Sequence, residues 1–165
     1  ILGTLGYFDG VDLEASPLTT PTAPQLARWL ARIEANGCTH AVMEISSHAL
    51  EQRRVAGLEL DVACVTNVRR DHLDFHGSLA GYRQAKAKIL ERLRPEGCAV
   101  FNADDAGSMS LSSLIDGAAM TVGVDAPAEI TATPLESWPS EQTFLLEVER
   151  ESVPVRTHLI GRHNI

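Results

Sequence analysis

The sequence has no long apolar run: none of its hydrophobic stretches approaches the roughly 18 residues that a membrane-spanning helix requires. Cysteine is scarce, and Cys38, Cys64 and Cys98 lie far apart without a CxxC pair. This usage argues against a cysteine zinc site and predicts buried, reduced thiols in a cytoplasmic protein. No secretion signal is visible, although the first residue, Ile1, indicates a trimmed N-terminus.

Basic residues are outnumbered, since 14 lysines and arginines face 22 aspartates and glutamates, which gives a net charge of −8. This balance argues against binding to nucleic acid or to an anionic membrane. An anionic small molecule remains possible, because a few placed cations and backbone N–H groups bind such a ligand locally. The length of 165 residues and the hydrophobic content of 44% fit one globular domain.

The sequence also lacks the phosphate-binding loop G-x-x-x-x-G-K-[ST], so this cradle for nucleotide phosphates is not in the chain. What the chain does contain is an alternation of short apolar runs with helical patterns. The apolar runs predict four buried strands, at His40–Ile45, Val62–Asn67, Ala99–Asn102 and Met120–Val124.

Helix signals separate these strands. Thr22 caps a predicted helix in which Leu26, Leu30 and Ile33 recur at helical spacing, and Gly37 ends it. A short helix is predicted over Ser46–Arg54. A longer helix is predicted over Leu79–Leu93, with Ser78 as its cap and Gly97 as the residue that stops it. The segment before Thr22 begins with a loop or strand end over Ile1–Ser16.

Strands that alternate with helices and are continuously apolar predict a parallel sheet covered on both faces. Beyond Asp125 apolar and polar residues alternate, and an antiparallel hairpin is expected near Arg150–Ser152. We therefore expect an α/β fold, a mostly parallel doubly wound sheet with a small antiparallel β addition near the C-terminus. Ligands bind at the carboxyl ends of the strands in such sheets, and the segments there are Glu44–His48, Asn67–His76 and Asn102–Asp105.

Glu44 lies at the end of an apolar run, where a carboxylate is costly to bury unless it is paired or bound to a metal. Mg²⁺ prefers oxygen ligands and usually serves substrate phosphates. The alternative is a structural carboxylate that is hydrogen-bonded to Ser46, to Ser47 or to a helix N-terminus.

The segment TNVRRDHLDFHG contains two histidines, His72 and His76, at a spacing of four residues. On one helix face such a pair binds zinc, but Gly77 favours a loop and no third ligand is obvious. A single metal-bound histidine with carboxylate support is one alternative, and a hydrogen-bonded structural histidine is the other.

Lys86 lies one turn after Tyr82 and one turn before Ile89, beside the apolar stripe of the predicted long helix. A partly buried lysine needs a partner. The alternative is a lysine whose stem packs on the stripe while its amine reaches water. Lys88 points elsewhere and is expected to be solvated.

Several motifs follow one another along nearly the whole chain. They are TTP (Thr19–Pro21), MEISSHAL (Met43–Leu50), TNVRRDHLDFHGS (Thr66–Ser78), YRQAKAKIL (Tyr82–Leu90), NADD (Asn102–Asp105) and GRHN (Gly161–Asn164). Their order and spacing resemble those of the Mur ligases, and most closely the members that add the third residue of the peptidoglycan peptide. The resemblance implies that residues 1–165 are part of a central, ATP-using domain. The P-loop strand and helix, the N-terminal UDP-binding domain and the C-terminal amino-acid-binding domain are then absent.

The resemblance implies an ATP-dependent ligase. ATP phosphorylates the carboxylate of UDP-MurNAc-dipeptide, and an amino acid then attacks the acyl phosphate, which yields ADP, phosphate and the tripeptide precursor. The implied cofactors are ATP and Mg²⁺, and the implied partners are the two small-molecule substrates and the remaining domains of the same enzyme. The amino acid that is added is not readable from this chain.

The resemblance also assigns roles to single residues. Glu44, His72 and Lys86 match ligands of a magnesium ion near the ATP γ-phosphate, and Lys86 matches a lysine that is carbamylated. His72 and Lys86 are thus the catalytic candidates, and Asn164 matches an asparagine near the adenine. Contacts to the UDP-MurNAc-peptide are implied for Thr19, Thr20, Ser46, Gln52 and Arg54, of which Arg54 suits an anionic group.

Other hypotheses stay open. The chain departs from the usual pattern at three positions, Ala49, Arg69 and His163, where glycine, serine and phenylalanine are common. One alternative is another ligase of the superfamily, such as a folylpolyglutamate synthetase, and a second is a non-catalytic binding domain with the same fold. A third is a zinc hydrolase that uses both His72 and His76. The TTP and ISSHALEQR motifs favour the muramoyl-peptide ligase.

Overall fold

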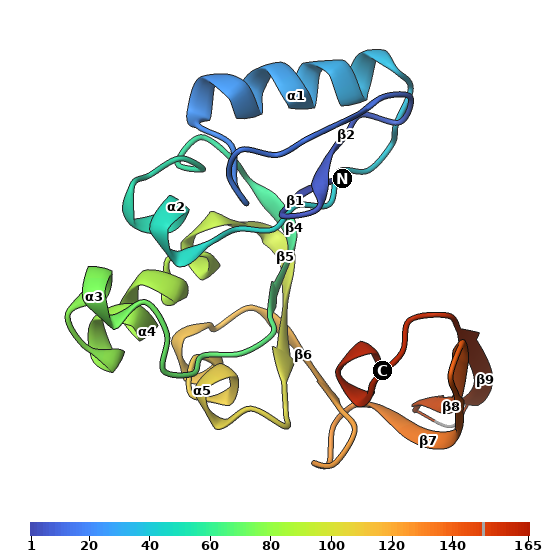
Figure 1. Cartoon of the computed structure of the whole chain (residues 1–165). Coiled ribbons are helices and arrows are strands. Elements are labelled where there is room, and N and C mark those ends of the chain that lie inside the picture. Colours follow the sequence, from blue (N-terminus) through green and yellow to red (C-terminus); the bar gives the residue numbers. More distant parts are fainter. Residues whose placement is uncertain (150) are drawn as a thin grey trace. The chain divides into compact units, whose positions relative to one another are not determined.

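The computed structural model describes residues 1–149 and 151–165, so that Arg150 of the predicted hairpin turn lies outside the described residues (Figure 1). The chain forms two compact units. The first comprises Ile1–Glu59 and Arg70–Arg92, and the second comprises Leu60–Arg69 and Leu93–Ile165. Each unit is described by itself below.

The first unit begins with three short antiparallel strands over Ile1–Ser16, where a loop or strand end was expected. Their bounds are β1 (Leu2–Gly3), β2 (Gly6–Phe8) and β3 (Leu13–Glu14). Helix α1 (Ala23–Ala35) lies beside these strands (Figure 1). The Tyr7 and Trp29 rings meet edge to face, with 5.4 Å between their centroids. Each large apolar side chain buried in this way contributes about 2 kcal/mol to folding.

Helix α1 confirms its sequence signals. The Thr22 backbone N–H donates to Gln25 Oε1 at 3.1 Å, which is one half of a capping box. Leu26 and Ile33 are buried at helical spacing. Gly37 follows the helix with a φ of +79°, a left-handed conformation that ends helices at little cost to glycine.

Three more α-helices and a 3₁₀ turn complete the first unit. They are α2 (Ser47–Glu51), α3 (Leu73–His76), α4 (Leu79–Ala87) and η1 (Leu90–Arg92). Ser46 and Ser78 cap α2 and α4 by accepting hydrogen bonds from Ala49 N–H and Gly81 N–H. The predicted long helix to Leu93 is therefore wrong in its second half.

The second unit contains a sheet whose strands follow one another in sequence order. They are β4 (Leu60–Val65), β5 (Leu93–Asn102), β6 (Ala118–Gly123), β7 (Ile130–Trp138), β8 (Glu141–Val148) and β9 (Glu151–Thr157). The pairs from β4 to β7 are parallel, and β8 and β9 add antiparallel pairs, with Val148 opposite Glu151 in the predicted hairpin. This arrangement confirms the expected α/β fold with an antiparallel addition.

Strand pairing explains where the long helix was predicted wrongly. Leu93 pairs with Leu60, so the chain is already extended where the helical pattern continues. Gly97 lies inside β5 and does not stop a helix. A Cβ at this position would lie 2.9 Å from the Leu60 carbonyl oxygen, so glycine permits a close approach of the two strands.

The strand predicted over His40–Ile45 is reduced to a single bridge between Met43 and Leu2. Its two hydrogen bonds run from Leu2 N–H to the Val42 carbonyl and from Glu44 N–H to the Leu2 carbonyl. Because β1 is only two residues long, the ladder ends there, and Val42 stays 67% exposed. The apolar run predicted a buried strand, but in the described structure no neighbouring strand covers Val42.

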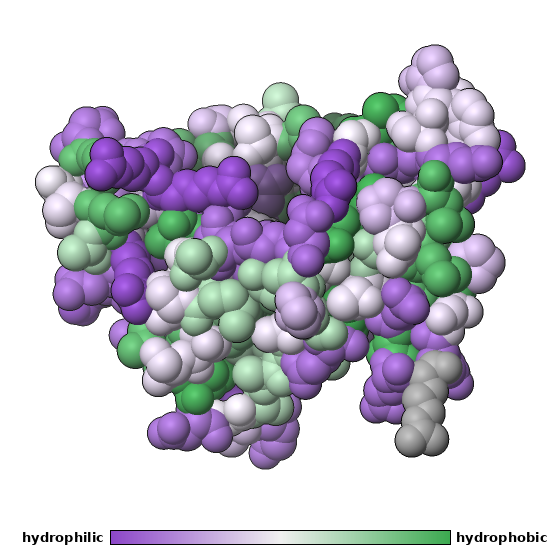
Figure 2. Space-filling model, turned by 90° about the horizontal axis from the view of Figure 1, so that it is seen from below, coloured by the Kyte–Doolittle hydropathy of each residue, from purple (hydrophilic) through white to green (hydrophobic). Residues whose placement is uncertain are grey.

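Apolar residues on the face seen in Figure 2 are scattered among polar ones. The three cysteines are free thiols, but none of them is buried as predicted. Cys38 and Cys98 are partly exposed, and Cys64 is exposed because its side of β4 is uncovered. No helix among the described residues has the length and apolar character that crossing a membrane demands. The remaining short helices of the second unit are α5 (Ala106–Met109), η2 (Ser112–Leu114) and η3 (Arg162–Asn164).

Candidate functional site

A hydroxyl network in the first unit joins the TTP motif to the start of α2. The fully buried Thr20 donates from Oγ1 to the Glu44 carbonyl at 2.9 Å and accepts from Ser46 N–H at 3.0 Å. Ser46 uses its own hydroxyl to cap α2, where it accepts from Ala49 N–H at 3.2 Å. Thr20 and Ser46, predicted as substrate contacts, therefore also hold the backbone on which Glu44 stands.

Glu44 is exposed, and its carboxylate accepts one side-chain hydrogen bond, from Thr4 Oγ1 to Oε2 at 2.6 Å. Thr4 also lies 3.1 Å from Thr19 Oγ1, so it connects both residues. The predicted alternative of a carboxylate bound to Ser46, Ser47 or a helix N-terminus does not describe this contact. Nothing in the sequence pointed to Thr4, because its spacing from Glu44 reflects only tertiary structure.

Gly3 allows the Glu44 carboxylate to lie against β1. A Cβ at Gly3 would come within 2.5 Å of Glu44 Oε1 and within 2.9 Å of Glu44 Cδ. Since real Cβ contacts are much longer, any other residue at Gly3 would displace the carboxylate. The position of Glu44 thus depends on two neighbours in the segment Gly3–Thr4.

Arg54 and Gln52 complete the network at the end of α2. Arg54 Nη1 donates to the Thr20 carbonyl at 2.9 Å, and Nε and Nη2 donate to Gln52 Oε1 at 2.9 and 2.5 Å. Both acceptors are uncharged, so among the described residues no carboxylate neutralises this half-buried guanidinium. A fixed cation with neutral partners is suited to bind an anionic group of a ligand.

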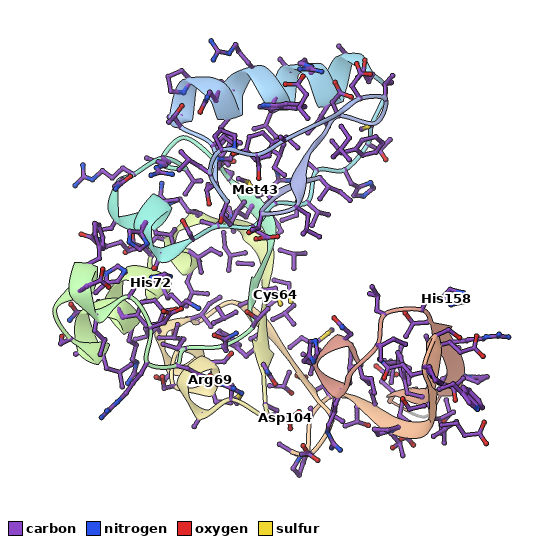
Figure 3. The ribbon with its side chains drawn as sticks, in the orientation of Figure 1. Met43, Cys64, Arg69, His72, Asp104 and His158 are labelled. Carbon is purple, nitrogen blue, oxygen red and sulfur yellow. The ribbon has the colours of Figure 1, made fainter. Side chains whose placement is uncertain are left out.

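A second cluster of the first unit consists of aromatic and imidazole rings around His72. The His48 ring lies 4.8 Å from the His72 ring and 4.1 Å from the Phe75 ring, measured between centroids. The His72 ring also faces the buried Tyr82 at 6.3 Å. Figure 3 shows His72 beside α3 and α4. His48 lies on α2, so α2, α3 and α4 together surround the histidine.

His72 has a left-handed backbone, with φ 49° and ψ 35°, at the N-cap of α3. This conformation costs a residue other than glycine about 1 kcal/mol, and such strain is concentrated at functional sites. Asp71 Oδ1 accepts from His72 N–H at 2.8 Å, and Asp71 Oδ2 lies 3.5 Å from His72 Nε2. Asp71 is thus the carboxylate in contact with His72, and the adjacent letters DH were its only signal in the sequence.

His76 is engaged separately from His72. Its Nε2 lies 3.0 Å from Ser47 Oγ, and burial, followed by the neighbouring His48, lowers its pKa. His76 is therefore neutral at pH 7 and has the environment of a structural histidine. Within residues 1–149 and 151–165, no three histidine, cysteine, aspartate or glutamate side chains are grouped to hold a metal, so a zinc site built on both histidines gains no support.

Lys86 is half-buried on α4, and its Nζ lies 5.1 Å from the centre of the Tyr82 ring. His72 and Lys86 thus both lie near the Tyr82 ring, and Lys86 follows Tyr82 by one turn of α4. Lys88 forms an ion pair with Glu51 at 2.6 Å, as expected of a surface lysine. No contact among the described interactions joins Glu44 to His72 or Lys86.

The donors fit a magnesium ion in their chemistry. Glu44 offers carboxylate oxygens with one protein hydrogen bond, and His72 offers a half-exposed imidazole. Mg²⁺ commonly takes only one or two protein carboxylates and completes its coordination with waters and phosphate oxygens. The Glu44 carboxylate therefore has the chemistry of a Mg²⁺ ligand, whereas a joint site with the His72 nitrogen stays a prediction.

The NADD segment in the second unit is structural. Asp105 is 5% exposed and accepts from Val68 N–H at 2.9 Å, Ser108 N–H at 2.8 Å and Arg69 Nε at 3.0 Å. Burial raises its pKa, but these donors outweigh burial and the net pKa is lowered. Asn102 donates to the Thr66 carbonyl at 2.9 Å. The strand-end rule therefore marked this segment correctly as polar, although its side chains are used within the protein.

Asn164 lies in η3 of the second unit. Its Nδ2 donates to the Ile160 carbonyl at 2.8 Å and lies 3.2 Å from His163 Nε2. The amide oxygen has no hydrogen-bond donor among the described contacts. Asn164 is thus fixed by local bonds and keeps one polar atom for a ligand.

Comparison with known proteins identifies relatives over the whole chain. The family model of the Mur ligase middle domain matches residues 1–165. The UDP-N-acetylmuramoyl-L-alanyl-D-glutamate--2,6-diaminopimelate ligase of Chlamydia caviae is 37% identical over 165 residues, which are 100% of this chain and 34% of that protein. The protein of the same name from Synechococcus elongatus is 39% identical over 167 residues, which are 100% of this chain and 33% of that protein.

A solved structure supports the same relationship. The chain is similar to a structure of a UDP-N-acetylmuramoyl-L-alanyl-D-glutamate--2,6-diaminopimelate ligase with a TM-score of 0.78 and 31% sequence identity. The match covers 93% of this chain and 33% of that chain. The present chain thus spans about a third of the length of the relatives it matches.

Proposed function

Because the chain belongs to the Mur ligase family, with a match over all of its residues, we propose that it is the central part of an ATP-dependent ligase. The proposed reaction joins an amino acid to UDP-MurNAc-L-Ala-D-Glu in peptidoglycan precursor synthesis. The names of the relatives make 2,6-diaminopimelate the proposed amino acid. The phosphate loop and two flanking domains are proposed to lie outside these residues, and the cytoplasm is the proposed location.

One observation carries this proposal: residues that are far apart in sequence, from Thr19 to Arg54, form one hydrogen-bonded network. Thr19 presents a hydroxyl, and Arg54 presents a charge with neutral partners only, whereas the buried Thr20 hydroxyl holds the backbone of Glu44 and Ser46 in place. A UDP-linked peptide carries pyrophosphate and carboxylate groups, which such donors recognise. We assign the anionic part of this substrate to Arg54, and its polar groups to Thr19, Ser46 and Gln52.

Glu44 and His72 are proposed to hold Mg²⁺, which would neutralise phosphate charge while the substrate carboxylate is phosphorylated. Lys86 is proposed to carry a carbamate, formed when its neutral amine attacks CO₂ and loses a proton. The carbamate would replace a cation by an anion near the Tyr82 ring, which the His72 ring also faces. Asn164 is proposed to contact the adenine of ATP.

The function is tested with the full-length ligase and purified substrates. ADP release is expected only when UDP-MurNAc-L-Ala-D-Glu, diaminopimelate and Mg²⁺ are all present. ADP release with a folate and glutamate, without the muramoyl substrate, would instead establish the folylpolyglutamate alternative. Binding of the muramoyl substrate without ADP release from either substrate pair would instead establish the non-catalytic binding domain.

The carbamate is tested by Lys86→Ala in the full-length enzyme. We expect a loss of ligase rate of roughly a hundredfold, because an anion near the developing charge is removed. Added formate or acetate should partly restore the rate, whereas Lys88→Ala, on the same helix, should stay near the wild-type rate. Full activity of Lys86→Ala without added carboxylate would contradict the assignment.

A further inference from the structure

The GRHN segment in the second unit is held from two sides. On one side the buried Gln142 donates from Nε2 to the Leu159 carbonyl at 2.7 Å and to the Gly161 carbonyl at 3.0 Å. On the other side the Arg162 guanidinium forms an ion pair with Asp125. Arg162 is the first residue of η3, which ends at Asn164. One ion pair therefore links Asp125 to the 3₁₀ turn that carries Asn164.

Asp104 fixes the position of Asp125. Its carboxylate accepts three backbone N–H bonds from one loop, from Val124 at 2.7 Å, Asp125 at 2.9 Å and Ala126 at 2.6 Å. Three successive N–H groups that converge on one anion form a rigid, preorganised turn. Burial alone would raise the pKa of Asp104, but these bonds outweigh it and lower the pKa, so the carboxylate stays ionised at neutral pH.

Asp104 is itself anchored at the end of β5 (Figure 3). Its N–H donates to Asn102 Oδ1 at 2.9 Å, and Asn102 Nδ2 donates to the Thr66 carbonyl beyond β4 at 2.9 Å. The neighbouring Ala103 N–H donates to the Val122 carbonyl of β6 at 2.8 Å. A continuous series of bonds thus leads from the central strands, through Asp104 and its loop, to Arg162.

We propose that Asp104 is a positioning residue for the nucleotide, which acts through the Val124–Ala126 loop and the Asp125–Arg162 ion pair on the Gly161–Asn164 segment. This inference rests on the proposed contact between Asn164 and adenine. It gives the first acidic residue of the NADD motif a task that differs from that of its neighbour Asp105, which caps α5 and binds Val68 and Arg69.

The first test is Asp104→Asn in the full-length ligase, with ADP affinity measured by calorimetry. An amide cannot accept three N–H bonds with both of its terminal atoms, so we expect the Kd for ADP to rise about tenfold. The KM for UDP-MurNAc-dipeptide should change less than about twofold, since Asp104 contacts none of the residues assigned to that substrate. Asp116→Asn makes the same chemical change at an exposed aspartate of the same unit and should leave both values unchanged.

The second test exchanges the ion pair and does not depend on the folding of Asp104→Asn. The side chains of Arg162 and Asp125 are 56% and 71% exposed, so solvent screens the pair and Asp125→Arg or Arg162→Asp alone should raise the Kd for ADP only about threefold. The double variant should return to within about twofold of wild type, because the pair is restored in reverse.

The outcomes separate this inference from the proposed function. If the wild-type enzyme binds ADP but Asp104→Asn binds it equally well, or if the double exchange binds more weakly than both single variants, the positioning role is wrong and the function stands. If Asp104→Asn weakens ADP and the muramoyl substrate to the same extent, its role is general stability. If the wild-type enzyme binds no ADP, the proposed function itself is overturned, together with this inference.

Discussion

Two carboxylates that each follow an apolar run, Glu44 in the first unit and Asp105 in the second, have opposite surroundings. Glu44 is exposed and accepts one hydroxyl hydrogen bond, whereas Asp105 is 5% exposed and accepts from two backbone N–H groups and an arginine. A carboxylate has about four acceptor positions. The number of hydrogen-bond donors already bound to a carboxylate therefore distinguishes a structural residue from one that is available to a ligand.

The largest expected effect is on stability, from Asp105→Ala. The change removes the N-cap of α5 and leaves the buried Val68 N–H without a partner, which together should lower the free energy of unfolding by about 3 kcal/mol. Urea denaturation of the full-length protein measures this value. Asp116→Ala, at an exposed aspartate, is the matched control and should cost less than about 0.5 kcal/mol.

A loss below about 1 kcal/mol for Asp105→Ala would mean that the donors around this carboxylate do not stabilise the fold. Asp105 would then not be the structural carboxylate that its hydrogen bonds indicate.

A smaller effect is expected on substrate binding, from Arg54→Lys. Lysine keeps the charge but loses the fork that contacts Thr20 and Gln52, so the KM for UDP-MurNAc-dipeptide should rise about tenfold. Arg69→Lys is the matched change at an arginine already paired with Asp105, and its KM should stay within about twofold of wild type. Equal effects of both changes on KM would show that neutral partners do not mark a ligand-binding arginine.

The smallest effect at neutral pH is on stability and concerns Asp9, a carboxylate of the first unit that, like Asp105, accepts hydrogen bonds from two backbone N–H groups and an arginine. N–H bonds from Asp12 and Val11, opposed by burial and aided by Arg32, hold its pKa at about 2. A folded pKa below the ordinary value of 3.8 stabilises the protein above pH 3.8, and this contribution is lost as the pH falls from 3.8 to 2.

The pH dependence gives the test for Asp9. Urea denaturation between pH 5 and pH 2 should show a shallower loss of stability in Asp9→Asn than in wild type, because the asparagine cannot titrate. Asp12→Asn, whose side chain is 73% exposed, should follow the wild-type curve. Parallel curves of stability against pH for wild type and Asp9→Asn would mean that the pKa of Asp9 is the same in the folded and unfolded states.

Local signals predicted much of the fold. The caps at Thr22 and Ser78 were predicted, because a capping residue and its helix are adjacent in sequence. The strands β4 and β6 were found within two residues at each end, since both are short apolar runs. The extended start of β5 at Leu93 was missed, because it depends on pairing with Leu60, a tertiary interaction that outweighs helical periodicity.

The candidate site was predictable only where a motif carried it. Their positions in the sequence marked Glu44, His72 and Lys86 as candidates, whereas the roles assigned to them came from a family resemblance and stay predictions. The neighbours that fix them, such as Thr4 beside Glu44, came only from the structure, because contacts between distant segments leave no local pattern. Tyr82 was readable in part, since the spacing of four residues to Lys86 places both on one helix face.

The difference between the two carboxylates is tested by comparing Glu44→Gln with Asp105→Asn in the full-length ligase. Both remove one negative charge with little change in shape, and the fraction of folded protein is matched by circular dichroism before ADP release is measured. The exposed, weakly bonded Glu44 predicts a fall in rate of roughly a hundredfold or more with unchanged stability. Asp105→Asn should lose stability and keep its rate per folded molecule within about threefold. A folded Glu44→Gln enzyme with the wild-type rate would contradict the account.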